Sequence, residues 1–192
     1  VLSTAPPAVI PRPWVLAEIA YSGNKNVKPS VMRSSIKARK GDLYDRPELD
    51  RDVQSLLGLG NFERVGADIS LTDKPVPSHL RKAAGGDRMV KLTFFVVEKP
   101  LVKKIKFEGN KKVSKGVLSD LISLKSKDPL DALKLKEDEQ KIIEKYHEKG
   151  FLDAAVASRV DKDTATLQAV VFFKIEEGPK SKIFWVRVAG TK

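Results

Sequence analysis

The sequence predicts an α+β protein that consists of tandem β-α-α-β-β modules, each a three-stranded mixed sheet with two antiparallel helices on one face. Three observations carry this prediction: a strand-and-turn motif recurs along the chain, two stretches of helical periodicity follow it, and each copy closes with a nearly continuous apolar run. The 192 residues can hold one domain or two small ones, since roughly 100 to 200 residues per domain is only a prior. The repeat favours two.

The recurring motif is a strand that runs into a glycine turn. Residues 19–27 and 105–113 align position by position through a Gly-Asn-Lys turn, and residues 186–192 repeat the strand with Gly-Thr-Lys. Each copy alternates apolar and polar residues before the glycine, which is typical of a half-buried strand that enters a turn. Glycine suits such a turn because it adopts positive φ without steric cost. We therefore expect strands to end at Gly23 and Gly109.

Two helices are expected after each turn. Pro29 fits the first turn of one helix, and Ser114 is a candidate N-cap at the matching place in the second copy. The second helix of each copy carries one apolar face, which comprises Leu49, Val53, Leu56 and Leu57 in the first copy and Leu135, Ile142, Ile143 and Tyr146 in the second. Each of these helices is predicted to end at a glycine. Polar connections at 40–45 and 126–131 are expected to join the helices.

Two strands are expected to close each module, at 64–71 and 89–98 in the first copy and at 154–160 and 167–176 in the second. The last strand of each copy is nearly all apolar, which indicates a central position in the sheet. The penultimate strands are rich in small residues and are predicted to be edge strands. An insertion at 72–88 in the first copy is expected to be a mobile loop, because lengthening a surface loop costs little entropy.

These elements divide the chain into four segments. We expect an extended lead-in over 1–13, a first module over 14–99, a second module over 100–177 and the first strand of a truncated third module over 178–192. The module junctions are expected at Lys99, Pro100, Leu101, Gly178 and Pro179. Proline at each junction indicates a short, semi-rigid hinge.

The composition gives no support for catalysis or for cofactor binding. The chain has no cysteine, and neither His79 nor His147 has an acidic partner at the spacing of a metal site. Acidic residues on the second helices alternate with lysines and are expected to form surface ion pairs, namely Asp50, Asp52, Glu137, Asp138 and Glu139. No apolar run reaches the length of about 18 residues that a membrane-spanning helix needs. We therefore expect a binding scaffold with no catalytic residue, metal or cofactor, and not an enzyme.

The net charge of +11 raises the alternative of a basic nucleic-acid-binding tandem module. The chain ends hold a large share of this excess, so that each predicted module is nearly balanced and we expect no nucleic-acid partner. A basic patch at the start of the second module comprises Lys103, Lys104, Lys106, Lys111, Lys112 and Lys115. The patch is expected to be either a solvated face or a contact with anionic lipid headgroups.

The order of these elements resembles that of POTRA (polypeptide-transport-associated) domains. The resemblance covers about residues 14–192, and both copies end in a short junction, Glu98-Lys-Pro100 or Glu177-Gly-Pro179, before a new strand begins. The sequence departs from the pattern in its long insertion and in Thr191 at the third turn. POTRA domains occur in series before the membrane β-barrel of BamA-like outer-membrane assembly proteins, with relatives in chloroplast envelopes and in two-partner secretion.

The resemblance implies a periplasmic substrate-docking and scaffold region of an outer-membrane protein assembly factor, tethered to the outer membrane through a C-terminal barrel. The implied partners are unfolded outer-membrane proteins, accessory assembly lipoproteins, the C-terminal membrane β-barrel of the same full-length chain and, at the basic patch, an anionic membrane surface. Two alternatives share the fold: the POTRA region of a two-partner secretion exporter and that of a chloroplast envelope import channel.

The resemblance also implies how clients bind. An extended client pairs with an exposed sheet edge through main-chain hydrogen bonds, which require little side-chain identity. By position in the module, the client-strand edges comprise Arg64, Val65, Ala67, Ile69, Ala155, Val156, Ala157 and Ser158. An exposed edge is also a general liability that proteins protect, so a purely structural reading of these residues stays open.

Overall fold

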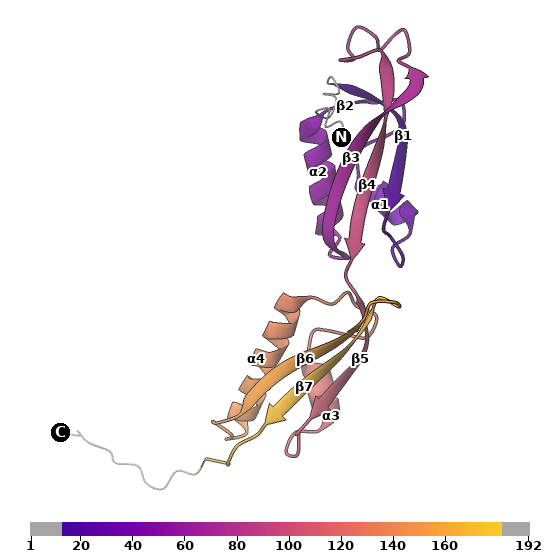
Figure 1. Cartoon of the computed structure of the whole chain (residues 1–192). Coiled ribbons are helices and arrows are strands. Elements are labelled where there is room, and N and C mark those ends of the chain that lie inside the picture. Colours follow the sequence, from indigo (N-terminus) through magenta and orange to yellow (C-terminus); the bar gives the residue numbers. More distant parts are fainter. Residues whose placement is uncertain (1–12, 182–192) are drawn as a thin grey trace, which may run out of the picture. The chain divides into compact units, whose positions relative to one another are not determined.

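The computed structural model describes residues 13–181, which fold into two compact units that divide between Glu98 and Lys99 (Figure 1). The lead-in expected over 1–13 lies outside the described residues except for Pro13, and the strand expected at 186–192 lies entirely outside them. Within residues 13–181, none of the helices combines the length and apolar character that a membrane span requires.

The first unit is a mixed sheet with two helices on one face. Its strands are β1 (Trp14–Ser22), β2 (Leu43–Tyr44), β3 (Phe62–Pro75) and β4 (Arg88–Glu98), in the spatial order β2-β1-β4-β3. Strand β4 runs parallel to β1 and antiparallel to β3, which confirms the central position predicted from its apolar run. The helices are α1 (Pro29–Ser35) and α2 (Arg46–Gly58), and Met32, Leu49 and Leu56 on them are buried in the core.

Strand β2 was not expected, because the connection at 40–45 was interpreted as a polar turn. Its two residues pair antiparallel with Trp14 and Val15 at the start of β1. A two-residue strand is too short to show alternation in sequence. The matching connection of the second unit forms only an isolated bridge between Leu101 and Pro129, since proline has no N–H to donate to a ladder.

The insertion at 72–88 also differs from the expected mobile loop. Strand β3 continues to Pro75, and the N–H of Val76 then donates to the carbonyl of Asp87 (2.9 Å). A separate small core forms here, of Val15, Ala17, Val76 and Met89. Val15 and Ala17 alternate along β1 with residues of the main core, so this small core covers the face of the sheet that lies opposite the helices.

The second unit repeats the architecture with three strands. Its elements are β5 (Leu101–Glu108), α3 (Lys115–Leu121), α4 (Ala132–Glu148), β6 (Ala155–Asp163) and β7 (Gln168–Glu176). The sheet order is β5-β7-β6, with β7 parallel to β5 and antiparallel to β6. The central position predicted for the last strand is therefore confirmed in this unit as well, and so is the edge position of the penultimate strand.

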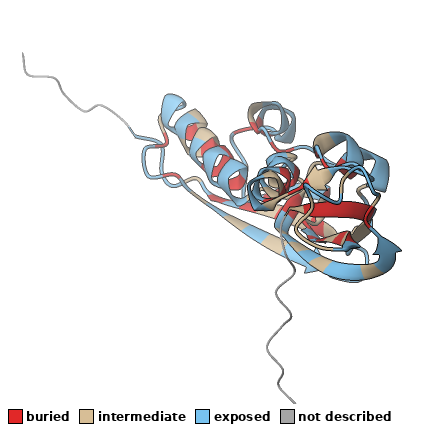
Figure 2. Ribbon diagram, turned by 90° about the horizontal axis from the view of Figure 1, so that it is seen from above, coloured by how far each residue is buried: buried red, intermediate tan, exposed pale blue. Residues whose placement is uncertain are grey.

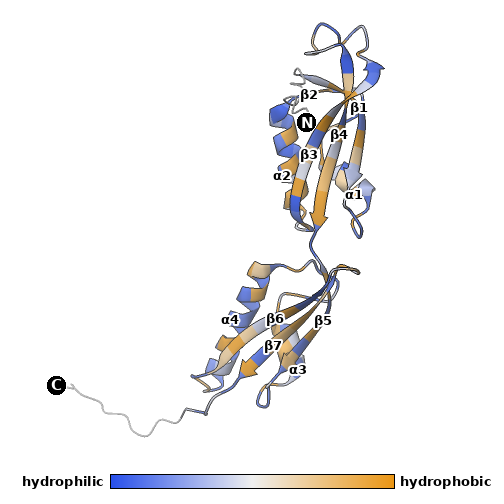
Figure 3. Cartoon of the chain, viewed as in Figure 1, coloured by the Kyte–Doolittle hydropathy of each residue, from blue (hydrophilic) through white to orange (hydrophobic). Residues whose placement is uncertain are grey.

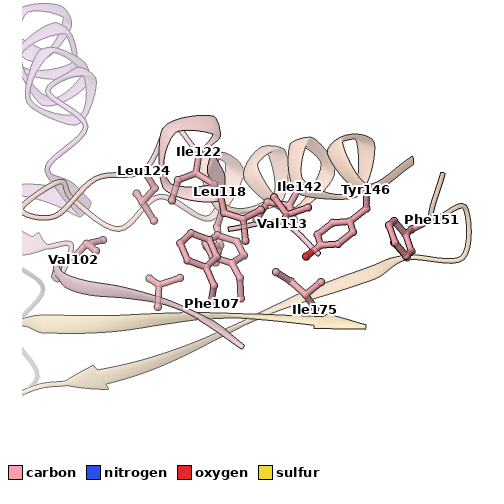
Figure 4. Packing of buried hydrophobic residues seen from close by; sticks show 14 residues of the cluster. Val102, Phe107, Val113, Leu118, Ile122, Leu124, Ile142, Tyr146, Phe151 and Ile175 are labelled. Atoms are coloured by element: carbon pink, nitrogen blue, oxygen red, sulfur yellow. The ribbon is translucent and has the colours of Figure 1, made fainter. Parts of the chain in front are cut away.

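Each unit has its own core between the helices and the sheet. Figure 2 shows buried residues concentrated along the helix faces that turn toward the sheets. Figure 3 shows hydrophobic residues along much of β4, whereas α2 carries both hydrophobic and hydrophilic residues. In the second unit, Phe107 and Ile175 from the strands pack toward Leu118 and Ile142 from the helices (Figure 4). Helical periodicity of the sequence thus predicted which helix faces are buried.

The two turn glycines bring the chain close to the neighbouring strand. Gly23 has a φ of +88° and Gly109 a φ of +86°, so both lie in the left-handed region expected of them. A Cβ atom on Gly23 would overlap the carbonyl oxygen of Val96, and one on Gly109 would overlap that of Ile175, both within the 3.0 Å below which such contacts essentially do not occur. Glycine is therefore required here by a close approach as well as by its φ angle.

Candidate functional site

The first candidate docking edge is the outer side of β3. Among residues 13–181, strand β3 pairs only with β4, so that its other side ends the sheet. Val65, Ala67 and Ile69 pack against the core, and Arg64 is exposed. Every residue predicted for this edge therefore lies on an edge strand.

The second candidate docking edge is the outer side of β6, which pairs with β7 and with no other strand of the described part of the chain. Val156 packs against the core, whereas Ala155 and Ala157 are exposed on the opposite face. Ser158 is half-buried, and its N–H donates to a carboxylate oxygen of Glu139 on α4 (2.7 Å). One main-chain donor on the outer side of this edge is thus already occupied.

The expectation that Glu139 forms only a surface ion pair is wrong. Glu139 is 7% exposed, and its second oxygen accepts from Lys136 Nζ (2.8 Å). Burial by itself raises the pKa of Glu139, but the hydrogen bonds from Lys136 and Ser158 outweigh burial and hold the pKa below its ordinary value. The carboxylate is therefore charged at neutral pH while it caps the edge amide.

Two further carboxylates expected at the surface are buried. Asp52 is 1% exposed and accepts from the N–H groups of Lys37 and Ala38 (2.8 and 2.9 Å) and from the hydroxyl of Tyr44 (2.7 Å). This hydroxyl has a raised pKa, because it is buried and donates to Asp52. The carboxylate therefore fixes the segment that follows α1. Of the acidic residues in this helix, only Asp50 forms the expected surface pair, with Arg46 (2.9 Å).

Asp138 occupies the same position in the second unit and is fully buried. It accepts from the N–H groups of Ser123 and Leu124 (2.7 and 2.9 Å) and from Lys141 Nζ (3.1 Å). Burial raises its pKa, and these hydrogen bonds outweigh burial and lower it. Sequence analysis missed this role, although the spacing of 86 residues between Asp52 and Asp138 equals the repeat and could have revealed it.

A second pair of carboxylates closes the turn after the first strand of each unit. Glu98, 4% exposed, accepts from the N–H groups of residues 25–27 at 2.7 to 3.1 Å. Burial raises the pKa of Glu98, but these hydrogen bonds outweigh it and lower the pKa. Glu177 accepts from Lys111 N (2.6 Å), Lys112 N (2.7 Å) and the hydroxyl of Tyr146 (2.9 Å). Consecutive N–H groups that converge on one carboxylate form a nest, and here the nest has a structural role.

The predicted junction residues have defined contacts within the second unit. Lys99 Nζ lies 3.5 Å from a carboxylate oxygen of Asp131, the carbonyl of Pro100 accepts from Leu130 N (2.8 Å), and Leu101 N donates to the carbonyl of Leu167 (2.9 Å). At the far end Gly178 has a φ of +65° and Pro179 follows it. Their role as hinges stays a prediction.

The lysines of the basic patch are exposed, but they spread over three elements. Lys103, Lys104 and Lys106 lie on β5, Lys111 and Lys112 lie in the turn that binds Glu177, and Lys115 begins α3. The ammonium group of Lys106 lies 4.7 Å from the ring centre of Phe172, a cation–π contact. Contact of this patch with an anionic surface stays a prediction.

The described part of the chain contains no group of three or more His, Asp and Glu residues placed to hold a metal ion. The buried carboxylates described above bind main-chain N–H groups, lysines and tyrosine hydroxyls. These contacts explain why the carboxylates are buried: they anchor the main chain of neighbouring segments.

Comparisons with known proteins agree with the repeat. A family model described as POTRA, "Surface antigen variable number repeat", matches residues 15–99 and again residues 100–178. One curated relative, "Outer membrane protein assembly factor BamA" of Nitratidesulfovibrio vulgaris, is 30% identical over 177 residues, which are 92% of this chain and 21% of that protein. Another, "Putative outer membrane protein assembly factor" of Treponema pallidum, is 26% identical over 184 residues, 91% of this chain and 21% of that protein.

The chain therefore spans about a fifth of the length of the curated relatives that it matches. Among solved structures, the N-terminal domain of Omp85 from the cyanobacterium Thermosynechococcus elongatus aligns with a TM-score of 0.54 and 21% identity. The alignment covers 85% of this chain and 63% of that chain. This likeness concerns the fold.

Proposed function

Because the chain belongs to the POTRA family, as two consecutive repeats, we propose that it is the substrate-docking and scaffold region of a BamA-like outer-membrane protein assembly factor. The observation that carries this proposal is that, within residues 13–181, each repeat ends its sheet on a strand, β3 or β6, whose outer side pairs with no other strand. POTRA repeats of BamA belong to a non-enzymatic assembly factor, in agreement with the expectation that this chain is not an enzyme.

Strand addition is the proposed binding mode. A client segment in extended conformation pairs with the outer main-chain groups of β3 or β6, and its side chains then alternate between the helix face and the open face of the sheet. The hydrogen bonds come from the main chain, so clients of varied sequence are accepted. The proposed contact residues are Arg64, Val65, Ala67 and Ile69 on β3 and Ala155, Val156, Ala157 and Ser158 on β6.

The proposed location is the periplasm, and the proposed partners are unfolded outer-membrane proteins and accessory assembly lipoproteins. Two bacterial relatives that are named as assembly factors support this choice. Their alignments cover more than nine-tenths of the chain, at 30% and 26% sequence identity. A two-partner secretion exporter or a chloroplast envelope import channel would use the same fold, and the two curated relatives favour the assembly factor because both are named as such.

The experiment that tests strand addition compares two versions of one peptide. A peptide from a strand of an outer-membrane β-barrel protein is titrated into the isotope-labelled chain, and the amide resonances of β3 and β6 are followed by NMR. The control peptide has the same side chains but is N-methylated at alternate residues, so it cannot donate main-chain hydrogen bonds along one edge. We expect the unmodified peptide to shift and protect the edge amides and the methylated peptide not to. Equal binding of the two peptides, or no response at either edge, would contradict strand addition.

A further inference from the structure

The two candidate edges differ in the state of one main-chain donor. On β6, the N–H of Ser158 points away from β7 and donates to Glu139 (2.7 Å), which Lys136 holds from the other side (2.8 Å). A client strand needs this N–H, because strand addition uses the outward donors and acceptors of the edge. The client must therefore displace a charged side chain before it can pair along β6.

On β3, no side chain of the described residues hydrogen-bonds to the main-chain N–H at the corresponding position. Asp52 and Asp138 bind matching main-chain groups in the two units, so the next residue, Val53, corresponds to Glu139. The strand residue that corresponds to Ser158 is Ala67, since Ala67 pairs with Phe94 and Ser158 with Phe173 in equivalent registers. Val53 is apolar and packs against the core, so it offers the Ala67 amide no acceptor.

The open faces beside the two edges differ as well. Next to β3, Phe95 is 47% exposed and Val97 is 41% exposed, and Phe95 pairs with Gly66, which has no side chain to cover it. At the corresponding places beside β6 are Lys174 and Glu176, which form an ion pair with each other (2.9 Å). One edge thus adjoins exposed apolar surface and the other adjoins satisfied charges.

We propose that β3 is the open docking edge of this chain and that Glu139 closes β6 to strand addition. The inference depends on the docking function proposed above and assigns that function to one edge. The occupant of β3 is an extended polypeptide segment with an apolar or aromatic side chain on the open face, where it covers Phe95 beside Gly66. Such a segment gains apolar contact at β3, whereas the aromatic ring on the open face of β7, Phe172, is half-buried and lies beneath the cationic groups of Lys106 and Arg159.

The expected difference in client affinity between β3 and β6 follows from the hydrogen bond between Ser158 and Glu139, which a client at β6 must break. A hydrogen bond to a charged group contributes more to stability than one between neutral groups, and its loss corresponds to about a tenfold change in affinity or more. The client replaces the lost bond only in part, because its carbonyl is a neutral acceptor.

Exchange of the two matching residues tests the proposal. Glu139→Val gives α4 the residue that α2 carries, and Val53→Glu does the reverse, while Glu139→Gln keeps an acceptor oxygen and serves as the matched control. The probe is the β-barrel strand peptide described above, with its N-methylated counterpart, and the readout is the peptide concentration that half-saturates the amide shifts of each edge. Amide spectra without peptide establish that each variant is folded.

In the unsubstituted chain we expect half-saturation of β3 at a peptide concentration about tenfold or more below that of β6. Glu139→Val should bring β6 toward the affinity of β3, Glu139→Gln should raise the affinity of β6 only in part because its neutral acceptor still occupies the Ser158 amide, and Val53→Glu should weaken β3. Equal affinities of the two edges in the unsubstituted chain, or no gain at β6 in Glu139→Val, would overturn this inference and leave strand addition itself intact. Failure of the peptide to bind either edge in any variant would instead refute the proposed function, on which the inference depends.

Discussion

Replacement of Gly23 by alanine tests whether the turn after β1 is set by a close approach of the chain or only by its φ angle. Gly23 has a φ of +88°, and an added Cβ atom would overlap the carbonyl oxygen of Val96 on β4. Gly41 is a matched control in the same unit, because its φ is +93° but a Cβ atom there would meet nothing within 4 Å. The two substitutions therefore share the backbone strain and differ in the steric overlap.

The structure sets the expected magnitudes. Left-handed backbone costs an alanine roughly 1 to 2 kcal/mol, which is the whole effect expected of Gly41→Ala. In Gly23→Ala the overlap is with a main-chain atom of the central strand, so the end of β1 must move away from β4. The loss of one or two ladder hydrogen bonds that leave buried groups unsatisfied adds about 2 to 4 kcal/mol. The total is a large fraction of the ~5 to 15 kcal/mol by which domains are stable.

The assay is urea unfolding followed by the fluorescence of Trp14, which lies on β1 and is buried. A Trp185→Phe background leaves Trp14 as the only tryptophan, since the chain has two, and the signal then reports on the first unit. We expect Gly23→Ala to lower the free energy of unfolding by at least 2 kcal/mol more than Gly41→Ala, by the estimate above. Equal losses in the two variants would refute the argument from the Val96 carbonyl.

Three further predictions concern the buried groups. Asp138→Ala leaves the N–H groups of Ser123 and Leu124 without an acceptor, and that of Leu124 is buried, so the substitution should lower the free energy of unfolding of the second unit by about 1 to 3 kcal/mol; a loss below about 0.5 kcal/mol in urea unfolding would contradict an anchoring role. The pKa of Glu98 is lowered in the folded state, so its contribution is present above an unfolded pKa of about 4.3 and is lost as the pH falls through the folded pKa. Glu98→Gln should therefore flatten the acid-side fall in the stability of the first unit, measured by urea unfolding between neutral and acidic pH, and an unchanged fall would count against the nest. Val76→Ala should accelerate hydrogen exchange over 76–89 while the main core stays protected, because Val76 is buried in the separate small core; uniform acceleration across the first unit would show that the insertion is part of the main core.

Much of the fold could be predicted from the sequence because its determinants are local. Apolar residues at helical spacing identified the buried faces of α2 and α4, and the glycine turns at Gly23 and Gly109 have the predicted positive φ. The continuous apolar runs identified β4 and β7 as central strands. Each of these signals lies within one element and reports how that element is buried.

The carboxylates were interpreted less well because their partners are distant along the chain. Asp52 lies near arginines and Asp138 and Glu139 lie near lysines on their helices, a pattern typical of surface pairs, yet their acceptor atoms bind main-chain N–H groups outside these helices. No periodicity reports such a contact, since the donor is a backbone group that every residue except proline carries. The spacing of 86 residues between Asp52 and Asp138 equals the repeat and indicates a shared role, which the interpretation as surface pairs missed.

The sequence by itself determined the order of the helices and of the longer strands, the two-module repeat and the edge position of β3 and β6, because hydrophobic spacing and turn glycines are properties of short segments. Only the tertiary structure decided which polar groups are buried, that the insertion packs as a small second core, and that the two edges are unequal. The inequality depends on one side chain, Glu139, that reaches from α4 to the amide of Ser158 on β6. A contact between two elements exists only once the chain has folded and brought them together.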